Sequence, residues 1–233
     1  MDAPIALITG SSRGLGRALV TALGARGWRL VMDGRDAGRL AAAAAALPHS
    51  ELVTAVPGDV ADPAHRAALA AAVGPRLDLL VNNASELGPS PLPRLADLPP
   101  EEFQRILAIN TVAPLALLQS VLPSIGRAGG RVINISSDAG VEAYEGWGGY
   151  GASKAALDHL TAVLAVEHPD LRIYAVDPGD MATDMHQAAF PGEDITDRPA
   201  PESVVPGLLA LVDGGLPSGR YRAVDLVPAG AAR

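Results

Sequence analysis

The stretch that decides the fold reads Thr9-Gly10-Ser11-Ser12-Arg13-Gly14-Leu15-Gly16. It follows a short apolar run at residues 5–8, which predicts a buried strand, and leads into a helical stretch at residues 14–25. Glycines at such a turn let backbone N–H groups and a helix N-terminus approach a pyrophosphate. The spacing Gly-x-x-x-Gly-x-Gly differs from the commoner Gly-x-Gly-x-x-Gly, so a nucleotide-binding loop and a purely structural turn both remain open.

Strand-like runs alternate with helical stretches along the rest of the chain. Strands are predicted at residues 5–8, 29–32, 52–56, 77–81, 131–135, 171–176 and 224–227. Helices are predicted at residues 14–25, 36–46, 62–73, 100–125 (bent near Pro114) and 150–167. This alternation predicts an α/β fold: a single Rossmann-type, doubly wound parallel sheet of about seven strands with helices on both faces. We expect one domain over residues 1–233, with a substrate loop at about 179–206, where the connection is unusually long.

Composition excludes several classes of function. The formal net charge of −8 argues against nucleic-acid binding, which needs a clustered positive surface. Cysteine is absent, which excludes disulfides and thiolate zinc sites, and the histidines lack metal-ligand spacing, so we expect no metal.

Two segments bear on location. The stretch between Arg105 and Arg127 is uncharged and long enough for a membrane span, but it contains Asn110, Pro114 and other polar residues. We interpret it as a buried helix of a soluble protein and expect no membrane partner. The N-terminus lacks the basic region of a signal peptide, so the expected location is cytoplasmic.

Tyr150 and Lys154 stand four residues apart in a predicted helix and therefore share one face. A free tyrosine has a pKa of about 10, which a neighbouring ammonium would lower toward a useful range for acid–base chemistry. The pattern Tyr-x-x-x-Lys is common by chance, so an ordinary exposed pair is the alternative. Ser136-Ser137 follows a strand end, however, and ligands of open α/β sheets bind at the carboxyl ends of strands, near the glycine loop.

Taken together, these motifs resemble the main branch of the short-chain dehydrogenase/reductase family over nearly the whole chain. Beyond the glycine loop, the family's Asp-Val is matched by Asp59-Val60, its Asn-Asn-Ala-Gly by residues 82–85 with Ser85 as the last residue, and its Pro-Gly by Pro178-Gly179. The resemblance implies that Asn110, Ser137, Tyr150 and Lys154 are catalytic. It implies cofactor contacts from Gly10, Ser12, Arg13, Gly14, Leu15, Gly16, Arg35, Asp59, Val60, Asn82, Ala84, Tyr150, Lys154, Pro178, Gly179 and Thr183.

The resemblance also implies a role for each catalytic residue. Ser137 would hydrogen-bond the substrate carbonyl, and Tyr150 would protonate the developing alkoxide while hydride arrives at carbon. Lys154 would bind the nicotinamide ribose and lower the tyrosine pKa, and Asn110 would position a water that links the lysine to solvent.

The second strand ends in Met32-Asp33-Gly34-Arg35. An acidic residue here favours the ribose 2′-OH of NAD and an arginine favours the 2′-phosphate of NADP, so these residues alone leave both cofactors open. In the family, the NAD-selecting acid lies twenty-four positions after the first glycine of the loop, which is Gly34 here. The next position is Arg35, and Asp33 should point away from the ribose. The resemblance therefore implies NADP(H) in preference to NAD(H).

The sequence says much less about the substrate than about the cofactor. The residues expected around it are Ser137, Glu86, Asp138, Tyr144, Trp147, Met185 and His186. Their acidic groups would suit a cationic or polyhydroxy substrate, with a solvated rim as the alternative. His186 could be a pocket acid, a substrate contact or a simple surface residue. We expect an NADP(H)-dependent oxidoreductase that interconverts a small-molecule carbonyl and an alcohol. The alternatives are an NAD-linked alcohol dehydrogenase and a non-catalytic NADP-binding sensor or scaffold. The resemblance implies a homodimer or homotetramer.

Overall fold

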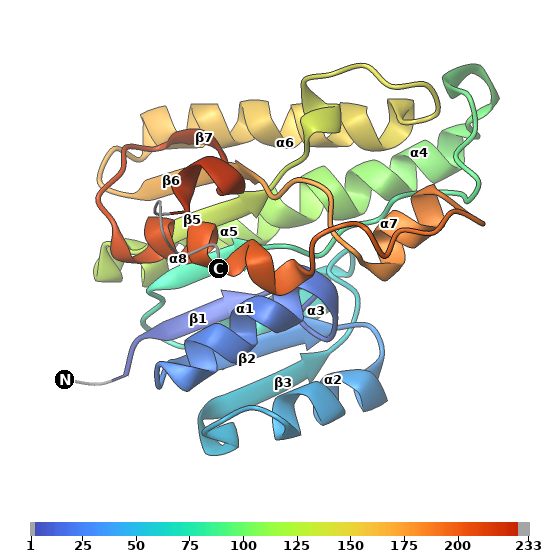
Figure 1. Cartoon of the computed structure of the whole chain (residues 1–233). Helices are drawn as coiled ribbons and strands as arrows, with labels where there is room; N and C mark the ends of the chain where they lie inside the picture. Colours follow the sequence, from blue (N-terminus) through green and yellow to red (C-terminus); the bar gives the residue numbers. More distant parts are fainter. Residues whose placement is uncertain (1–2, 228–233) are drawn as a thin grey trace.

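Seven parallel strands form one sheet through the middle of the molecule (Figure 1). This computed structural model describes residues 3–227. The strands are β1 (Ile5–Ile8), β2 (Arg29–Gly34), β3 (Val53–Pro57), β4 (Leu79–Asn82), β5 (Arg131–Ile135), β6 (Arg172–Asp177) and β7 (Gly219–Arg222). Their order is β3-β2-β1-β4-β5-β6-β7, so the winding reverses between β1 and β4 and leaves a crevice beyond their carboxyl ends. The predicted doubly wound sheet is confirmed.

Helices cover both faces of this sheet (Figure 1). They are α1 (Gly14–Ala25), α2 (Ala37–Ala45), α3 (Pro63–Val73), α4 (Pro100–Leu107), α5 (Ala113–Ala128), α6 (Gly148–Glu167), α7 (Asp184–Ala189) and α8 (Val205–Asp213). α1, α2 and α8 share one core with Ala6 and Ile8, whereas α3 and α5 share the other with Ile5 and Leu7. Alternate residues of one strand thus enter opposite cores, which explains why the strands are apolar throughout.

The uncharged stretch forms part of one continuous helical segment, Pro100–Ala128. Its length and composition would suit a membrane span, but half of its most apolar window is buried inside the protein. Leu117, Val121 and Ile125 are at most 1% exposed and pack in the core that α5 shares with α3 and the sheet. The irregularity expected near Pro114 is a π-helical turn, Ala108–Val112, that joins α4 to α5. Pro114 itself lies in the first turn of α5, where its missing N–H is tolerated.

Two segments in the C-terminal third differ from the prediction. The seventh strand was expected at residues 224–227 but lies at Gly219–Arg222, where Ala175 of β6 pairs with Arg220; the earlier position was wrong. Residues 223–226 form a 3-10 helix instead. The segment 179–206 is long, as expected, but it contains α7 and a 3-10 turn, Pro201–Ser203.

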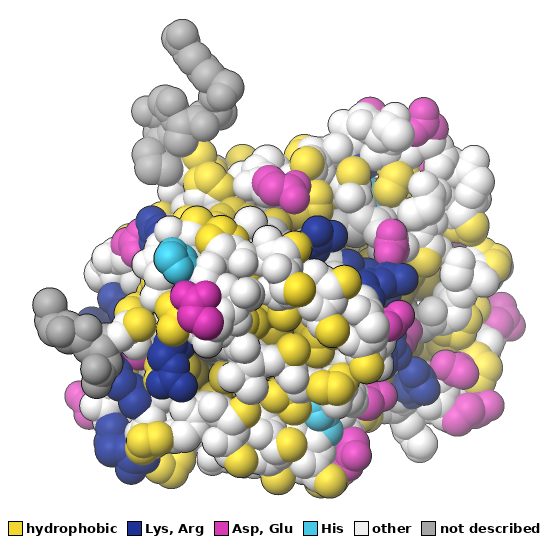
Figure 2. All heavy atoms as spheres, turned by 90° about the horizontal axis from the view of Figure 1, so that it is seen from below, with side chains coloured by type: hydrophobic (Ala, Val, Ile, Leu, Met, Phe, Trp, Pro, Cys, Tyr) yellow, Lys and Arg dark blue, Asp and Glu magenta, His cyan; other side chains and the backbone are white. Residues whose placement is uncertain are grey.

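Charges of both signs are dispersed over the face seen in Figure 2. Basic and acidic side chains lie among each other there, and hydrophobic side chains occur between them. Many surface charges are paired locally, as in Arg26 with Asp213 at 2.9 Å. The acidic excess is therefore not gathered into one region of this face.

Candidate active site

A cavity of about 1370 Å³ opens at the carboxyl ends of the strands. It is larger than the ~300–1,000 Å³ of ordinary ligand pockets, so a dinucleotide and a small substrate would fit together. The predicted site residues that line it are Gly10, Ser12, Arg13, Gly14, Leu15, Arg35, Asp59, Val60, Ala84, Ser137, Asp138, Tyr144, Trp147, Tyr150, Lys154, Pro178, Gly179, Thr183, Met185 and His186. Gly16, Asn82, Glu86 and Asn110 are not on its wall.

Two glycines of the loop, Gly10 and Gly16, pack too tightly against their neighbours to carry a side chain. Gly10 and Gly14 have φ angles of +63° and +55°, in the left-handed region that favours glycine. A Cβ on Gly10 would lie 2.8 Å from the Cα of Ala84, and a Cβ on Gly16 would lie 2.5 Å from the carbonyl oxygen of Gly10. Gly16 therefore shapes the loop from behind. Since no side chain caps the first turn of α1, its N–H groups remain available for a phosphate.

Gly16→Ala is expected to lower NADPH affinity at least about tenfold, because the Gly10 backbone must move to admit the new Cβ. A fluorescence titration with NADPH measures this effect. The matched control is Gly126→Ala in α5, where a Cβ meets nothing within 4 Å. That substitution should leave binding unchanged and stabilise the helix by about 0.5–1 kcal/mol. Equal NADPH affinity in both variants would contradict the packing argument.

Asp33, at the end of β2, is 1% exposed and bound on both oxygens. It accepts a hydrogen bond from the Gly10 N–H at 3.0 Å, and its other oxygen lies 2.6 Å from Nε2 of His65 on α3. Burial raises the pKa of Asp33, and the hydrogen bonds from His65 and Gly10 oppose that rise. Asp33 therefore braces the glycine loop, whereas Arg35, two residues further on, lines the cavity.

Two arginines on the cavity wall, Arg13 and Arg35, form ion pairs with carboxylates. Arg35 lies 3.2 Å from Glu86, which Arg105 also approaches at 3.6 Å. Arg13 lies 2.6 Å from Asp184 at the start of α7. All three arginine side chains are about half exposed, so these surface pairs are weak and an incoming phosphate can replace the carboxylates.

Tyr150 lies on the cavity wall near the start of α6 and is 9% exposed. Its ring meets Trp147 edge-on, with centroids 5.7 Å apart. Burial raises the pKa of Tyr150 to about 12, while hydrogen bonding with the hydroxyls of Ser85 and Ser137 acts in the opposite direction. The phenol is therefore protonated at neutral pH, and the lower pKa expected from Lys154 is not seen in the protein alone.

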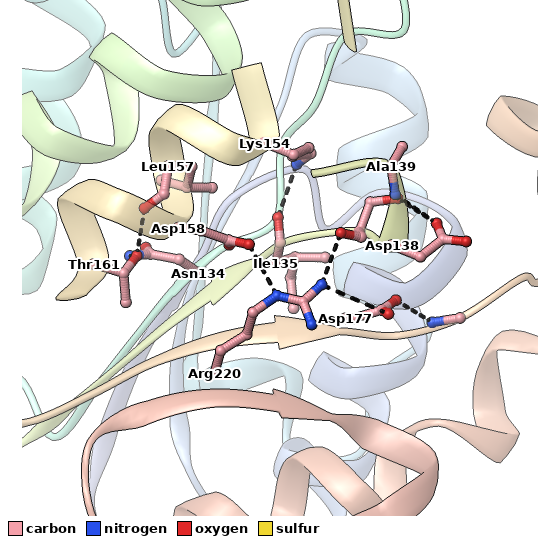
Figure 3. A network of polar contacts seen from close by, with 12 residues as sticks. Asn134, Ile135, Asp138, Ala139, Lys154, Leu157, Asp158, Thr161, Asp177 and Arg220 are labelled. Atoms are coloured by element: carbon pink, nitrogen blue, oxygen red, sulfur yellow. Dashed lines mark hydrogen bonds and ion pairs between the residues drawn. The ribbon is translucent and has the colours of Figure 1, made fainter. Parts of the chain in front are cut away.

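Lys154 is 2% exposed, and its Nζ donates to the carbonyl oxygen of Ile135 at 2.8 Å (Figure 3). Nζ also lies 5.4 Å from the centroid of the Tyr150 ring. Burial lowers the pKa of Lys154 to about 8, and the nearby Asp158 carboxylate partly opposes this. The lysine therefore shares a wall of the cavity with Tyr150 and keeps most of its charge at neutral pH.

Asn110 lies in the π turn and is fully buried. Its Nδ2 donates to the Glu86 carbonyl at 2.8 Å and to the Ser153 hydroxyl at 2.9 Å. Its Oδ1 accepts from the Glu86 N–H at 2.7 Å and from the Ser85 hydroxyl at 3.2 Å. These four bonds fill the capacity of the amide and tie the loop after β4 to α6. The water that Asn110 was expected to position stays a prediction.

Ser137 follows β5 and caps a 3-10 turn, Asp138–Gly140. Its hydroxyl donates to Oδ1 of Asp138 at 2.9 Å and accepts from the Ala139 N–H at 3.2 Å. Tyr144 donates to the other Asp138 oxygen at 3.0 Å. Ser137, Asp138 and Tyr144 therefore form a polar strip on the wall of the cavity that Tyr150 also lines.

Comparison with known proteins decides the family. The family model described as short chain dehydrogenase matches residues 4–194. The chain belongs to the short chain dehydrogenase/reductase family. The short chain dehydrogenase asqE of Emericella nidulans is 38% identical over 174 residues, which are 70% of this chain and 64% of that relative. The rhamnolipid-biosynthesis 3-oxoacyl-[acyl-carrier-protein] reductase of Pseudomonas aeruginosa is 37% identical over 172 residues, 70% of this chain and 66% of the relative.

A solved structure supports the same family. The short chain dehydrogenase of Shigella flexneri complexed with NADP superposes with a TM-score of 0.88 at 28% identity, covering 96% of this chain and 98% of that one. The chain spans slightly less than two thirds of the length of asqE and of the Pseudomonas reductase.

In this short chain dehydrogenase, the rest of the cavity wall around Tyr150 and Trp147 is apolar. Leu87 and Ala139 pack with Tyr150, and Leu92, Trp147 and Met185 lie against them. Phe190 stacks obliquely on Trp147 and on His186, whose side chain is only 10% exposed. His186 is thus a wall residue rather than a surface one. Glu86 is turned toward Arg35 and Arg105.

Two residues of the site, Ser85 and Ser153, were not predicted from the sequence, and a third, Asn82, lies elsewhere than predicted. Ser85 reaches both Asn110 and Tyr150, and its position in the Asn-Asn-Ala-Ser stretch was the only signal. Ser153 links Asn110 to the Tyr150 carbonyl, which it donates to at 2.6 Å. Asn82, expected to contact the cofactor, is 5% exposed and donates to Asn134 of β5 at 2.7 Å. Its side chain joins two strands away from the cavity.

Proposed function

We propose that this short chain dehydrogenase is an NADP(H)-dependent oxidoreductase that interconverts a carbonyl and an alcohol, with Tyr150 as the proton carrier. One observation carries the proposal: a buried phenol between two serine hydroxyls, beside a buried lysine, faces the cavity that contains the glycine loop. Proton transfer by a positioned side chain is what carbonyl reduction requires at oxygen.

Each residue around Tyr150 has a separate role in the proposed reaction. The bound nicotinamide supplies hydride to, or accepts it from, the substrate carbon. Ser137 turns its hydroxyl proton from Asp138 to the carbonyl oxygen, and Tyr150 gives its phenolic proton to the same oxygen as negative charge develops there. The Lys154 ammonium, close to the ring, stabilises the phenolate that remains. The raised pKa of Tyr150 keeps the proton in place until a substrate arrives.

NADP(H) is preferred to NAD(H) in this proposal because the cations at the adenosine end suit a 2′-phosphate. Arg35 and Arg13 both line the cavity, and the carboxylate of Asp33 is engaged elsewhere. The Shigella flexneri relative, crystallised with NADP, supports a nicotinamide cofactor of this kind.

Arg35→Ser is expected to weaken NADPH binding about ten- to a hundredfold and to leave NADH binding nearly unchanged, since a charge-assisted contact to phosphate is lost. Isothermal titration with both cofactors measures the change. Arg105→Ser is the matched control, because Arg105 also pairs with Glu86 but does not line the cavity. Equal losses for NADH and NADPH would refute the assignment of Arg35.

The substrate belongs to the apolar carbonyl compounds, given the walls formed by Leu87, Trp147, Met185 and Phe190. We propose that residues 179–206 form the substrate loop, with α7 bearing Met185 and His186 on the cavity wall. A panel of ketones, aldehydes and pterins with NADPH, followed by absorbance, tests the proposed function. Oxidation of NADPH by none of them would favour a cofactor-binding sensor.

Assembly into a homodimer or homotetramer is also proposed. Val112, the last residue of the π turn before α5, is 55% exposed, and Val163 and Val166 on α6 are 40% and 81% exposed. Exposed valines on neighbouring helices suit packing against a second copy. Analytical ultracentrifugation of the full chain tests it.

A further inference from the structure

The guanidinium of Arg220 joins three elements at the edge of the active site (Figure 3). From β7, its Nε donates to Asp158 at 2.9 Å and its Nη2 donates to the backbone carbonyl of Ser137 at 2.9 Å. The same Nη2 lies 3.8 Å from the carboxylate of Asp177. The arginine side chain is 29% exposed and the two carboxylates 14% and 6%, so this contact is partly sheltered from solvent. Planar, forked geometry of this kind is specific to arginine.

Each of the three partners belongs to an element that carries the site. Ser137 is itself proposed to bind the substrate carbonyl. Asp158 lies one helical turn after Lys154 on α6. Asp177 ends β6 and accepts from the Gly179 N–H at 2.9 Å, which shapes the Pro178-Gly179 turn on the cavity wall. Arg220 therefore connects the substrate side, the catalytic helix and the cofactor side.

Arg220 is also the counter-charge for a group of carboxylates. It supplies the only hydrogen bond that the carboxylate of Asp158 receives among residues 3–227, and Oδ1 of this carboxylate is buried without a partner. Asp138 and Asp177 both act to raise the pKa of Tyr150, and Asp158 acts to raise the pKa of Lys154. Asp158 and the Tyr150 ring are the groups that face Lys154. Asp138 and Asp177 act on Tyr150, and Asp138, Arg220 and Arg222 act on Asp177.

We propose that Arg220 is a positioning residue of this active site: it fixes Ser137 relative to α6 and balances the carboxylates of Asp158, which acts on Lys154, and Asp177, which acts on Tyr150. Arg220 lies outside residues 4–194, the stretch that the family model matches. The kinetic consequence rests on the proposed function, whereas the charge balance can be measured without turnover.

The chain offers a direct probe, because Lys154 is its only lysine. Protein labelled with ¹³C-lysine gives one side-chain Cε signal, whose titration reports the pKa of Lys154, about 8 in the native protein. Arg220→Met should raise that pKa by about 1, since Asp158 loses its counter-charge, and Asp158→Asn should lower it by a similar amount. The double variant should return near the native value, which also covers the case in which Arg220→Met alone folds poorly.

Arg220→Lys separates charge from geometry. It retains the charge, so the pKa of Lys154 should stay near 8, but an ammonium cannot reproduce the fork between Asp158 and the Ser137 carbonyl. Its kcat should therefore fall about tenfold with NADPH affinity unchanged. An unchanged Lys154 titration in Arg220→Met, or native kcat in Arg220→Lys, would overturn the proposal. If the native enzyme reduced no carbonyl, the proposed function would fail while the titration still decided the charge balance.

Discussion

Tyr150→Phe is expected to lower turnover at least about a thousandfold while NADPH affinity changes less than about twofold. The substitution removes only the phenolic oxygen, and the ring keeps its edge-on packing against Trp147 and its place in the apolar wall. Without that oxygen, the developing alkoxide has no proton donor at the required position. The measurements are kcat with the best carbonyl of the panel and a fluorescence titration with NADPH.

The matched control is Tyr174→Phe. Tyr174 is fully buried, as Tyr150 nearly is, but its hydroxyl donates to the Leu216 carbonyl at 3.0 Å, outside the cavity. This variant should lose about 1 kcal/mol of stability through the missing hydrogen bond and keep native kcat. Turnover retained in Tyr150→Phe would remove the tyrosine from its proposed role.

Lys154→Met is expected to be nearly inactive and, at neutral pH, more stable than the native protein. Burial lowers the pKa of Lys154 from 10.5 to about 8, so the folded state disfavours the ammonium. At 1.36 kcal/mol per pKa unit the ammonium costs about 3 kcal/mol of stability at pH 7. Methionine of similar shape removes that cost, and the lost hydrogen bond to Ile135 offsets about 1 kcal/mol, which leaves a gain of about 2 kcal/mol.

The stability difference between Lys154→Met and the native protein should depend on pH. The cost of the ammonium is fully present below pH 8 and fades as the pH rises to 10.5, because the native lysine is by then neutral in both states. The stability difference between variant and native protein should therefore shrink between pH 8 and pH 10. Tyr150, whose pKa is raised to about 12, stabilises the fold below pH 10 in both proteins and cancels from the comparison. Urea unfolding at pH 7 and pH 9.5 measures the difference. A Lys154→Met protein less stable at pH 7 would contradict the burial argument.

The helices and strands predicted at the observed residues are those whose hydrophobic pattern and turn residues lie within one short stretch of sequence. β1 and α1 lie at the residues expected, because an apolar run, a glycine turn and an amphipathic stretch follow one another without ambiguity. β7 was misplaced because Gly219–Arg222 is an edge strand of polar character, and its pairing with β6 is a long-range fact. The more apolar residues after it form a 3-10 helix.

The residues of the site likewise fall into those that local sequence predicts and those that only long-range contacts bring together. Tyr150 and Lys154 could be paired from their spacing on one helix, and the structure places both on the cavity wall. The contact of Arg220 with Asp158 joins residues 62 positions apart, so no local pattern reveals it. The buried pair of Asp33 and His65 is another such case, since each residue by itself has an ordinary surface alternative.

The polar character of β7 has a consequence for the molecule in solution. Within residues 3–227 the sheet ends at β3 and β7, and an open strand edge invites pairing with another chain. β7 is four residues long and places arginines at 220 and 222, while β3 ends at Pro57, which has no N–H to offer. Both edge strands therefore resist edge-to-edge aggregation. Concentrated solutions of the protein should not form cross-β fibres through these strands.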